Sequence, residues 1–521
     1  MGDAKLISAD MRDHGETWKH RFGWTHQIRS PIYQAFFKPG GRPWVILADP
    51  REIEDITARR DKEFDKDKTR GTNTFAVIAP KATITQALTP EFKAQRKQWL
   101  DTMRPEFLHR VVVPYIGTAA SELVELWNQK VSKAATSPID VHHDFSVAAL
   151  DTIWVAILGE RLGLTQAKID EFKQKGEMSM SKIGHGIDMG ATMDFINTLV
   201  QNYRTSIFTW YARWKLQRDS EYQKFRQIKD EAINRLIRKS VARFERILDG
   251  NIEGEEYDSC AMDMVLRRRL LAAQKAGQPA PDPTRDRALC DELFLLLWAG
   301  HDTTSITLSW FVKYMSNNIN VQDKLREAVK KALPGESIPS AAEIVNADIP
   351  YLDGAMEETL RLTGTAPVIV RDAKIDTEIL GHKVPKGTYV LMNTSIRDRP
   401  EPVPEELRSP SSRAARERRG YDWANEPCAE NLHEFAPERW LKKDMNGLEV
   451  FDSKTLPQNA FGDGARACFG KRLAYLELRI MIAHMIWHFK FLPLPEGYNS
   501  MRANEGMLRK AAQCYVRLQP V

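Results

Sequence analysis

The ten residues from Phe461 to Gly470, FGDGARACFG, constrain this chain more than any other stretch of its sequence. Three glycines around one cysteine predict a tight, non-helical loop, because glycine accepts backbone angles that other residues avoid. The residues that follow, from Lys471 to about Lys490, predict a helix. The loop therefore delivers Cys468 to a helix start, where unsatisfied N–H groups and the positive end of the helix dipole favour a thiolate.

Two interpretations of Cys468 follow from this pattern. A thiolate held in this way is a metal ligand, and a single one suits a haem iron better than the tetrahedral cage of a zinc ion. Gly470 would then let the backbone pass close to a flat macrocycle. The alternative is a buried structural cysteine beside a glycine-rich turn, which would be favoured for the cysteine alone because free cysteines are usually buried and inert. The glycines and Arg466 shift the balance towards the metal ligand.

The composition excludes several classes of protein. Hydrophobic residues make up 42% of the 521-residue chain and charged residues 28%, as in ordinary globular proteins. The net charge of +5, from 75 basic and 70 acidic residues, is too small to indicate a nucleic-acid partner. The five cysteines are scattered, which indicates a reducing compartment without a disulfide framework. No run reaches the roughly 18 apolar residues of a membrane span, and the polar N-terminus lacks a signal-peptide pattern.

The hydrophobic periodicity predicts a mainly helical fold with small β-sheets, of the α+β class. Residues 117–270 are overwhelmingly helical in pattern. A later helix, Leu289 to about Met315, is apolar on almost every face, which is typical of a helix buried in a large core.

Strands are predicted near the N-terminus. Residues Ile32–Phe37 and Trp44–Leu47 have strand patterns and are separated by Lys-Pro-Gly-Gly, which indicates a hairpin. The next helix is expected to start with Asp49 as its N-cap, Pro50 in the first helical position and Glu52 completing a capping box.

The apolar helix carries an unusual polar segment in its middle, Ala299–Thr304 with sequence AGHDTT. A buried acid beside hydroxyls is expensive in an apolar helix unless the acid is used or paired. Gly300 and the hydroxyls would let the helix open locally and admit water. On these residues alone, a reactive site and a kink with a satisfied acid are equally good interpretations.

Segments in the correct order resemble the cytochrome P450 superfamily over most of the chain, from residue 32 to its end. The stretch from Phe461 to Gly470 fills every fixed position of the haem-thiolate loop F-x-x-G-x-R-x-C-x-G, and Ala299–Thr303 matches A-G-x-D-T. Two further matches are the E-x-x-R pair Glu358–Arg361 and the P-E-R-[FW] segment Pro437–Trp440. In the family, the arginine of the P-E-R-[FW] segment, here Arg439, joins the E-x-x-R pair. This contact locks the segment that leads into the cysteine loop.

This resemblance implies a fold and a domain organisation. Residues 1–521 would form one cytochrome P450 domain, with a long buried central helix over a haem and the cysteine loop on the proximal side. Residues 1–30 would be a polar N-terminal segment. Residues 400–430 depart from the family spacing and are rich in Pro, Ser and Arg, so we expect a solvated, mobile surface insertion. The Met-containing stretch Met178–Phe195 would cover the substrate pocket.

The resemblance also implies roles for individual residues. Cys468 would bind the iron of haem b (iron protoporphyrin IX), held in a loop that also contains Phe461, Gly462, Arg466 and Gly470. The haem propionates would be neutralised by Arg96, Arg371 and Arg466, whereas Phe92 stands where the family usually has a Trp. Thr303 would steady the oxygen molecule, Asp302 would relay protons, and His301 would be structural.

The implied function is that of a haem-thiolate monooxygenase of eukaryotic, fungal type. It would insert one oxygen atom from O2 into a small hydrophobic substrate, a lipid or a secondary metabolite. Electrons would come from an NADPH–cytochrome P450 reductase or an equivalent donor, which would dock on a basic face made of Lys93, Lys97, Lys471 and Arg472. Two alternatives stay open, a haem-thiolate isomerase or peroxygenase and a non-catalytic haem sensor.

The expected location depends on the N-terminus. Eukaryotic members usually carry an N-terminal membrane helix, and this sequence shows none. We therefore expect the cytoplasmic side of the endoplasmic reticulum if an anchor has been removed, with peripheral membrane contact, and the cytoplasm otherwise.

Overall fold

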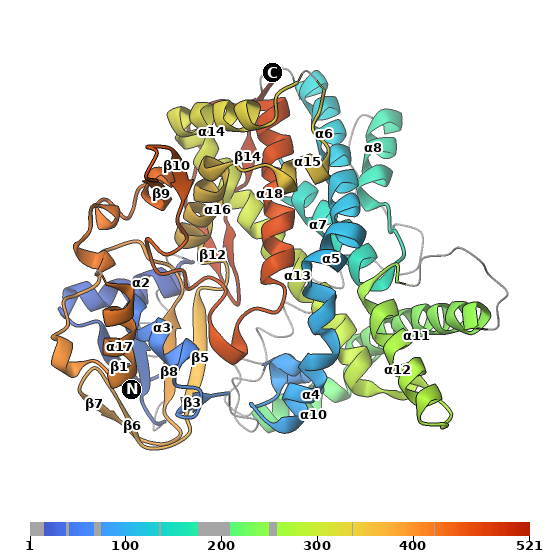
Figure 1. Ribbon diagram of the computed structural model, residues 1–521, viewed down its shortest axis with the longest axis horizontal. Coiled ribbons are helices and arrows are strands. Elements are labelled where there is room, and N and C mark those ends of the chain that lie inside the picture. Colours follow the sequence, from blue (N-terminus) through green and yellow to red (C-terminus); the bar gives the residue numbers. More distant parts are fainter. Residues whose placement is uncertain are drawn as a thin grey trace. The chain divides into compact units, whose positions relative to one another are not determined.

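The structure, a computed structural model, describes residues 15–37, 41–66, 74–134, 137–175, 209–248, 258–335, 337–420 and 422–521. It contains two compact units. The first unit comprises Met1–Lys66, Lys130–Phe145 and Thr303–Val521, and the second comprises Asp67–Gln129 and Ser146–Asp302. Helix α13 (Arg287–Asn317) begins in the second unit and continues into the first (Figure 1). The single-domain organisation stays a prediction.

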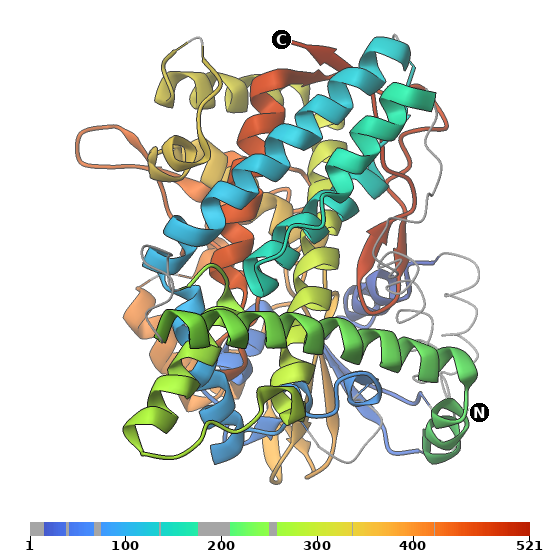
Figure 2. The same ribbon diagram turned by 90° about the vertical axis from the view of Figure 1, so that its right-hand side faces the viewer.

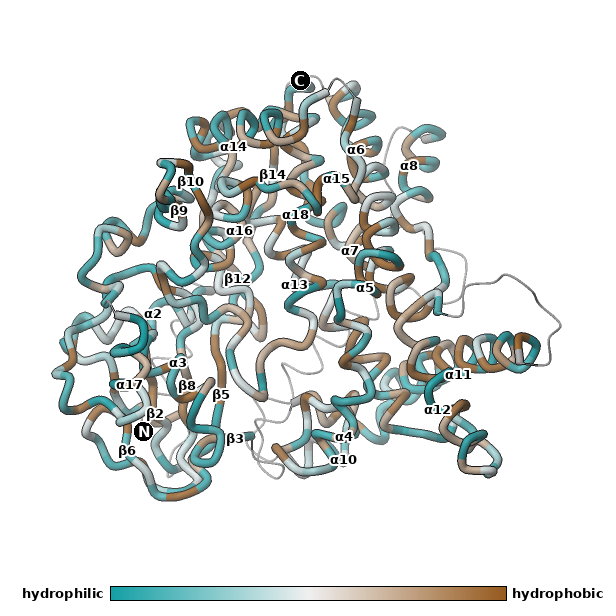
Figure 3. The backbone as a smooth tube through the Cα atoms, in the orientation of Figure 1, coloured by the Kyte–Doolittle hydropathy of each residue, from teal (hydrophilic) through white to brown (hydrophobic). Residues whose placement is uncertain are grey.

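The second unit consists of helices in the part of the chain that the structure describes. Besides α13, its α-helices are α4 (Pro90–Trp99), α5 (Pro105–Phe107), α6 (Val113–Ala134), α7 (His142–Leu158), α8 (Leu164–Lys175), α10 (Thr209–Gln217), α11 (Ser220–Leu248) and α12 (Ala261–Lys275), with the ends of α6 and α7 extending into the first unit. Figure 2 shows the long helix α11 in green, and Figure 3 shows hydrophilic and hydrophobic residues alternating along it. The predicted helical region is therefore confirmed over its described residues.

The first unit is built on a mixed five-stranded sheet. The order is β1-β2-β8-β5-β3, in which only β2 and β8 run parallel. These strands are β1 (Ile32–Ala35), β2 (Trp44–Leu47), β3 (Phe64–Asp65), β5 (Val368–Ala373) and β8 (Tyr389–Asn393). The antiparallel pairing of β1 with β2 confirms the predicted hairpin.

Helices and small two-stranded sheets complete the first unit. The helices are α2 (Thr17–Gln27), α3 (Pro50–Ala58), α14 (Ile319–Ala332), α15 (Ala341–Asn346), α16 (Pro350–Thr363), α17 (Pro410–Arg419) and α18 (Lys471–His488). The strand pairs are β4 (Ile139–Asp140) with β14 (Tyr515–Val516), β6 (Thr377–Ile379) with β7 (His382–Val384), β9 (Leu441–Lys443) with β10 (Glu449–Phe451), β11 (Phe489–Phe491) with β15 (Leu518–Pro520), and β12 (Ala503–Glu505) with β13 (Arg509–Ala511). Helix α18 begins directly after the cysteine loop, as predicted.

The start of α3 agrees with the sequence in one respect and differs in another. The Asp49 carboxylate accepts the backbone N–H of Glu52 at 2.7 Å, and Pro50 occupies the first helical position. Glu52 does not complete a capping box. Its carboxylate is buried and accepts a hydrogen bond from Arg60 at 3.0 Å, because a guanidinium eight residues away satisfies a buried charge better than one backbone N–H.

Helix α13 is continuous through its polar segment. It is α-helical from Arg287 to Asn317, so the local opening expected at Gly300 is not observed. A Cβ atom added to Gly300 would lie 2.6 Å from Cγ1 of Ile153 on α7. Glycine is therefore needed here for close helix packing.

One buried carboxylate organises the segment that leads to the cysteine loop. Glu358 on α16 accepts two hydrogen bonds from Arg361, at 2.8 and 2.6 Å, and one from Arg439 at 2.8 Å. The indole N–H of Trp440 and the backbone N–H of Ala436 complete its shell, at 2.9 and 3.0 Å. The predicted joining of Glu358 and Arg361 by Arg439 is confirmed, and it ties residues 436–440 to α16.

The insertion at residues 400–430 is folded, which the sequence did not predict. It contains α17 and short 3-10 turns at Glu405–Leu407, Trp423–Asn425 and Pro427–Ala429. Trp423 and Ala429 are buried in a cluster with Leu432, Trp440 and Leu456. Its polar composition misled the sequence analysis because the charged residues face partners elsewhere in the first unit.

Within the described residues, no helix is both long enough and apolar enough to cross a lipid bilayer.

Replacing Glu358 tests how strongly this carboxylate supports the fold. Glu358→Gln would leave Arg361 and Arg439 buried without a full counter-charge, so we expect a loss of about 3–5 kcal/mol in the free energy of unfolding, measured by urea titration. The matched control is Glu438→Gln, whose ion pair with Lys324 is largely exposed and should contribute less than about 1 kcal/mol. Equal losses in the two variants would contradict this account.

Candidate functional site

The cysteine loop has the conformation that its glycines predict. Gly462 and Gly464 have φ angles of +59° and +67°, in the left-handed region that favours glycine. The loop closes on itself through a hydrogen bond from the backbone N–H of Cys468 to the carbonyl of Phe461, at 2.8 Å. The Cys468 side chain is exposed two residues before the end of the loop, and α18 begins at Lys471. Cys468 is therefore presented at a helix start, as predicted.

The other loop residues have distinct surroundings. A Cβ atom at Gly462 would touch Ile369 of β5 at 3.4 Å, whereas one at Gly470 would have no neighbour within 4 Å. The open space beside Gly470 agrees with a backbone that a flat group approaches. The Phe461 ring packs against Tyr475 with centroids 5.4 Å apart, and the Lys471 ammonium lies 5.6 Å from the Phe461 centroid.

Cations gather beside this loop in the first unit. Arg371 on β5 is buried, and desolvation followed by repulsion from Arg466 lowers its pKa to about 10. Arg466 forms an ion pair with Asp65, with an N–O distance of 2.7 Å. Lys66 lies close enough that desolvation, Arg371 and Arg466 together lower its pKa to about 7, against the opposing effect of Asp65. A second buried acid, Asp372, also acts on Arg371, so three basic groups face two carboxylates in a poorly solvated place.

This arrangement fits haem b. A surplus of buried positive charge is stabilised by anionic groups, and the two propionates of the cofactor supply them. A cysteine thiolate is a soft ligand suited to iron. Cys468, Arg466 and Arg371 would hold the group, with Lys66 as a further cation.

Lys66 was missed by the sequence analysis. It follows the two-residue strand β3 at the start of a long region without periodicity, so its neighbours could not be deduced from the local pattern.

The polar segment of α13 is largely buried. The Asp302 carboxylate lies 3.6 Å from Nε2 of His301, which in turn contacts the Ser146 hydroxyl at 2.9 Å. This contact agrees with a structural role for His301. The Thr303 carbonyl accepts a hydrogen bond from the Thr307 hydroxyl at 2.9 Å, and α13 places Asp302 and Thr303 consecutively on one helix.

The remaining predicted residues fall in different places. The first unit contains Cys468, Phe461, Gly462, Arg466, Gly470, Arg371 and Thr303. Arg96 and Asp302 belong to the second unit. The guanidinium of Arg96 lies 5.9 Å from the ring centroid of Phe92, one turn earlier on α4, and its propionate role stays a prediction. The expected substrate lid, Met178–Phe195, lies outside the described residues.

A second residue that the sequence analysis missed is Glu477 on α18. It is 1% exposed, and one carboxylate oxygen accepts a hydrogen bond from the Thr304 hydroxyl at 3.1 Å. Its other oxygen has no hydrogen-bond partner among the described residues. Burial raises the pKa of Glu477 to about 8, so the side chain is predominantly protonated at neutral pH. The sequence signal that could have identified Glu477 is an acidic residue among the apolar residues of a helix predicted to be buried.

Comparisons with known proteins point to one family. A sequence model of the cytochrome P450 family matches residues 11–401 and 430–516. The cytochrome P450 monooxygenase GME11363 of Pestalotiopsis microspora is 31% identical, over 99% of this chain and 91% of its own length. The cytochrome P450 monooxygenase TRI13 of Fusarium sporotrichioides is also 31% identical, over 94% of this chain and 88% of its own. The chain therefore belongs to the cytochrome P450 family, and it is a haem-thiolate monooxygenase of fungal type.

Solved structures show the same fold. The haem domain of cytochrome P450DA superposes with a TM-score of 0.69 at 17% sequence identity, covering 98% of this chain and 94% of that one. The predicted fold, mainly helical with small sheets, is confirmed.

The buried acid of α18 should make stability depend on pH. The folded pKa of Glu477, about 8, lies above the ordinary value of 4.5, so the folded state keeps a proton that the unfolded chain releases. The free energy of unfolding should therefore fall as pH rises from about 5 to 8, by at most about 5 kcal/mol from this group. Glu477→Gln should flatten that fall in urea titrations at pH 5.5 and pH 8.

The control for this prediction is Glu496→Gln, which changes an exposed acid in the loop after α18. It should keep the wild-type pH dependence. A Glu477→Gln variant whose stability falls as steeply as the wild type would show that Glu477 ionises normally.

Proposed function

We propose that this monooxygenase binds haem b through the Cys468 thiolate and oxidises a small hydrophobic molecule, a lipid or a secondary metabolite. The observation that carries the proposal is the exposed Cys468 thiol in a closed loop beside the buried cations Arg371 and Arg466. When bound, the haem supplies the one-electron and O2 chemistry, and the chain supplies binding, orientation and protons.

On the proximal side, the chain would hold the cofactor by charge and by shape. Arg371 and Arg466 would each donate hydrogen bonds to a propionate, with Arg96 from the second unit as a third donor. Gly462 and Gly470 would keep the loop backbone close to the macrocycle, and the loop N–H groups would tune the thiolate. Phe461 would shield the sulfur side from water.

On the distal side, Asp302 and Thr303 would handle protons. The Thr303 hydroxyl would donate a hydrogen bond to oxygen, and Asp302 would bring protons to Thr303 from solvent. His301, whose Nε2 lies 3.6 Å from the Asp302 carboxylate, would hold the acid in place between transfers.

The substrate class is supported by composition and by relatives. The helix that carries the polar segment is mainly apolar, and two relatives at 31% identity are fungal cytochrome P450 monooxygenases. A screen of lipids and natural products for compounds that shift the haem spin state would measure this class directly.

Electrons would come from an NADPH-dependent reductase. Exposed Lys93, Lys97 and Arg472, with Lys471, would attract its acidic surface, so that turnover should weaken at high salt. The protein would act at the cytoplasmic side of the endoplasmic reticulum if the natural chain carries an anchor, with peripheral membrane contact, and in the cytoplasm otherwise.

Cys468→Ser tests the iron ligand. Serine cannot supply the thiolate, so we expect the thiolate-type band of the reduced CO complex to disappear, measured by difference spectroscopy on purified protein. The matched control is Cys428→Ser, which changes a half-buried cysteine of the insertion and should keep the band. An unchanged spectrum in Cys468→Ser would remove this residue as the ligand.

Thr303→Ala tests the proton role. Without the hydroxyl, NADPH consumption should continue while product formation per NADPH falls by at least about tenfold, with the missing electrons recovered as peroxide. The control is Ser316→Ala, which removes a hydroxyl near the C-terminal end of α13 that donates a hydrogen bond to the Val312 carbonyl. Normal coupling in Thr303→Ala would count against the relay.

A further inference from the structure

Residues 402–429 lie outside the match to the family sequence model. The family sequence model stops at residue 401 and resumes at 430, so it has no counterpart for this insertion. The structure nevertheless folds these residues and packs α17 against α3 (Figure 1). The docking of α17 on α3, in a stretch that the family model does not match, calls for a physical explanation.

Ion pairs attach the insertion to the start of α3. The guanidinium of Arg408 donates two hydrogen bonds to the Asp49 carboxylate, both at 2.9 Å, and both side chains are buried. Arg51 of α3 donates in the opposite direction, to the two oxygens of Glu405 at 2.8 and 2.5 Å. Two-pronged pairs of this kind fix orientation as well as distance.

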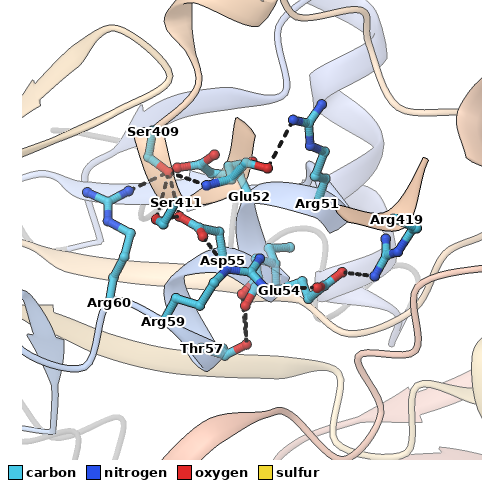
Figure 4. A network of polar contacts seen from close by, with 12 residues as sticks. Arg51, Glu52, Glu54, Asp55, Thr57, Arg59, Arg60, Ser409, Ser411 and Arg419 are labelled. Atoms are coloured by element: carbon cyan, nitrogen blue, oxygen red, sulfur yellow. Dashed lines mark hydrogen bonds and ion pairs between the residues drawn. The ribbon is translucent and has the colours of Figure 1, made fainter. Parts of the chain in front are cut away.

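Further contacts run along α3 towards its other end. The hydroxyls of Ser409 and Ser411 donate to the same oxygen of Asp55, at 2.6 and 2.9 Å, and Arg419 donates to Glu54 at 3.0 Å (Figure 4). Asp55 is completely buried. The insertion therefore contacts α3 from its N-cap to its second turn.

These contacts answer an electrostatic need of α3. The helix and its cap carry the acids Asp49, Glu52, Glu54 and Asp55 within seven residues. The pKa of Glu52 is raised to about 7, chiefly by desolvation; Asp49 and Asp55 add to the rise, and Arg60 and Arg408 oppose it. The arginines and hydroxyls of the insertion compensate for carboxylates that would otherwise repel one another in a buried place.

The C-terminal end of α3 supports the cysteine loop. A Cβ atom at Gly464 would lie 2.5 Å from the Thr57 carbonyl oxygen and 3.2 Å from Cα of Ala58. The loop backbone therefore rests directly on the last turn of α3, and a shift of that helix would displace the loop four residues before Cys468.

Charge connects the insertion to the same loop. Burial raises the pKa of Asp463, which neighbours Gly464 in the sequence. Lys471 lowers this pKa, Glu54 raises it, and Arg59 and Arg419 lower it. The guanidinium of Arg419 thus acts on the loop as well as on α3.

We propose that residues 402–429 brace the haem-thiolate loop through α3, with Arg408 and Arg419 as positioning residues. The brace keeps the last turn of α3 against Gly464 and so fixes the direction in which Cys468 is presented. The proposal rests on the proposed function, because it takes Cys468 as the ligand of the haem iron.

The experiment compares Arg408→Ala and Arg419→Ala with Arg418→Ala in the full haem-loaded chain. Arg418 is an exposed arginine on the same helix and is the matched control. Hydrogen exchange of the peptide covering residues 461–470 is measured by mass spectrometry, with the peptide covering α16 as internal reference. We expect exchange in the loop to become about tenfold faster in the two test variants, while α16 and the control stay within about twofold of wild type.

The second readout is the reduced CO complex. In both test variants a larger fraction should lose thiolate ligation than in the wild type, at temperatures well below unfolding. Arg419→Lys keeps the charge and can make the single contact with Glu54, so it should restore most of the thiolate-type band, whereas Arg408→Lys cannot form both hydrogen bonds to Asp49 and should restore it only in part. Arg408→Ala removes a buried pair and can impair folding, in which case the half-buried Arg419 supplies the test.

Two results would overturn the brace. One is a test variant with lower overall stability but unchanged loop exchange and an unchanged thiolate-type band. The other is equal acceleration of exchange in the loop and in α16, which would mean general destabilisation. Neither result affects the proposed function, which the CO spectrum of the wild type tests independently. A wild type that lacks the thiolate-type band would refute the proposed function and the brace together.

Discussion

The cost of burying charge governs the first unit of this protein. Glu358 is completely buried and accepts hydrogen bonds from two arginines, an indole and a backbone N–H. Removing Glu358 would leave both arginines without their shared counter-charge, so the set depends on this one carboxylate. The segment that it holds, residues 436–440, precedes the cysteine loop, so the direction of that loop depends on charges placed far from the sulfur.

The basic residues beside the cysteine loop differ from the Glu358 cluster because they face a place where an anionic ligand can bind. Arg371, Arg466 and Lys66 lie around the carboxylate of Asp65. Their lowered pKa values report poor solvation first, and repulsion from Arg466 lowers the pKa values of Arg371 and Lys66 further. The three basic groups of this cluster outnumber its two carboxylates, Asp65 and Asp372. A surplus of that kind marks the place where an anionic ligand completes the structure, and in this family the ligand is haem.

The sequence predicted what depends on neighbouring residues. The loop around Cys468, the apolar helix with its Asp302–Thr303 segment, the hairpin and the Asp49 cap are encoded over a few residues, and the structure has them. The insertion was misjudged because its arginines are polar in the sequence and buried only by distant partners. The Arg408–Asp49 pair joins residues 359 apart, and the Arg466–Asp65 pair joins residues 401 apart. Lys66 and Glu477 were missed for the same reason, since only tertiary contacts give them their neighbours.

The close fit between α3 and the insertion has a consequence for recombination between relatives. The acids of the helix and the guanidinium groups of the insertion complement each other across two stretches that are remote in the gene. Moving residues 402–429 alone into another scaffold would transfer cations without their carboxylates, and exchanging α3 alone would do the reverse. The smallest module that can be exchanged between such enzymes is therefore the pair of segments, inherited as one.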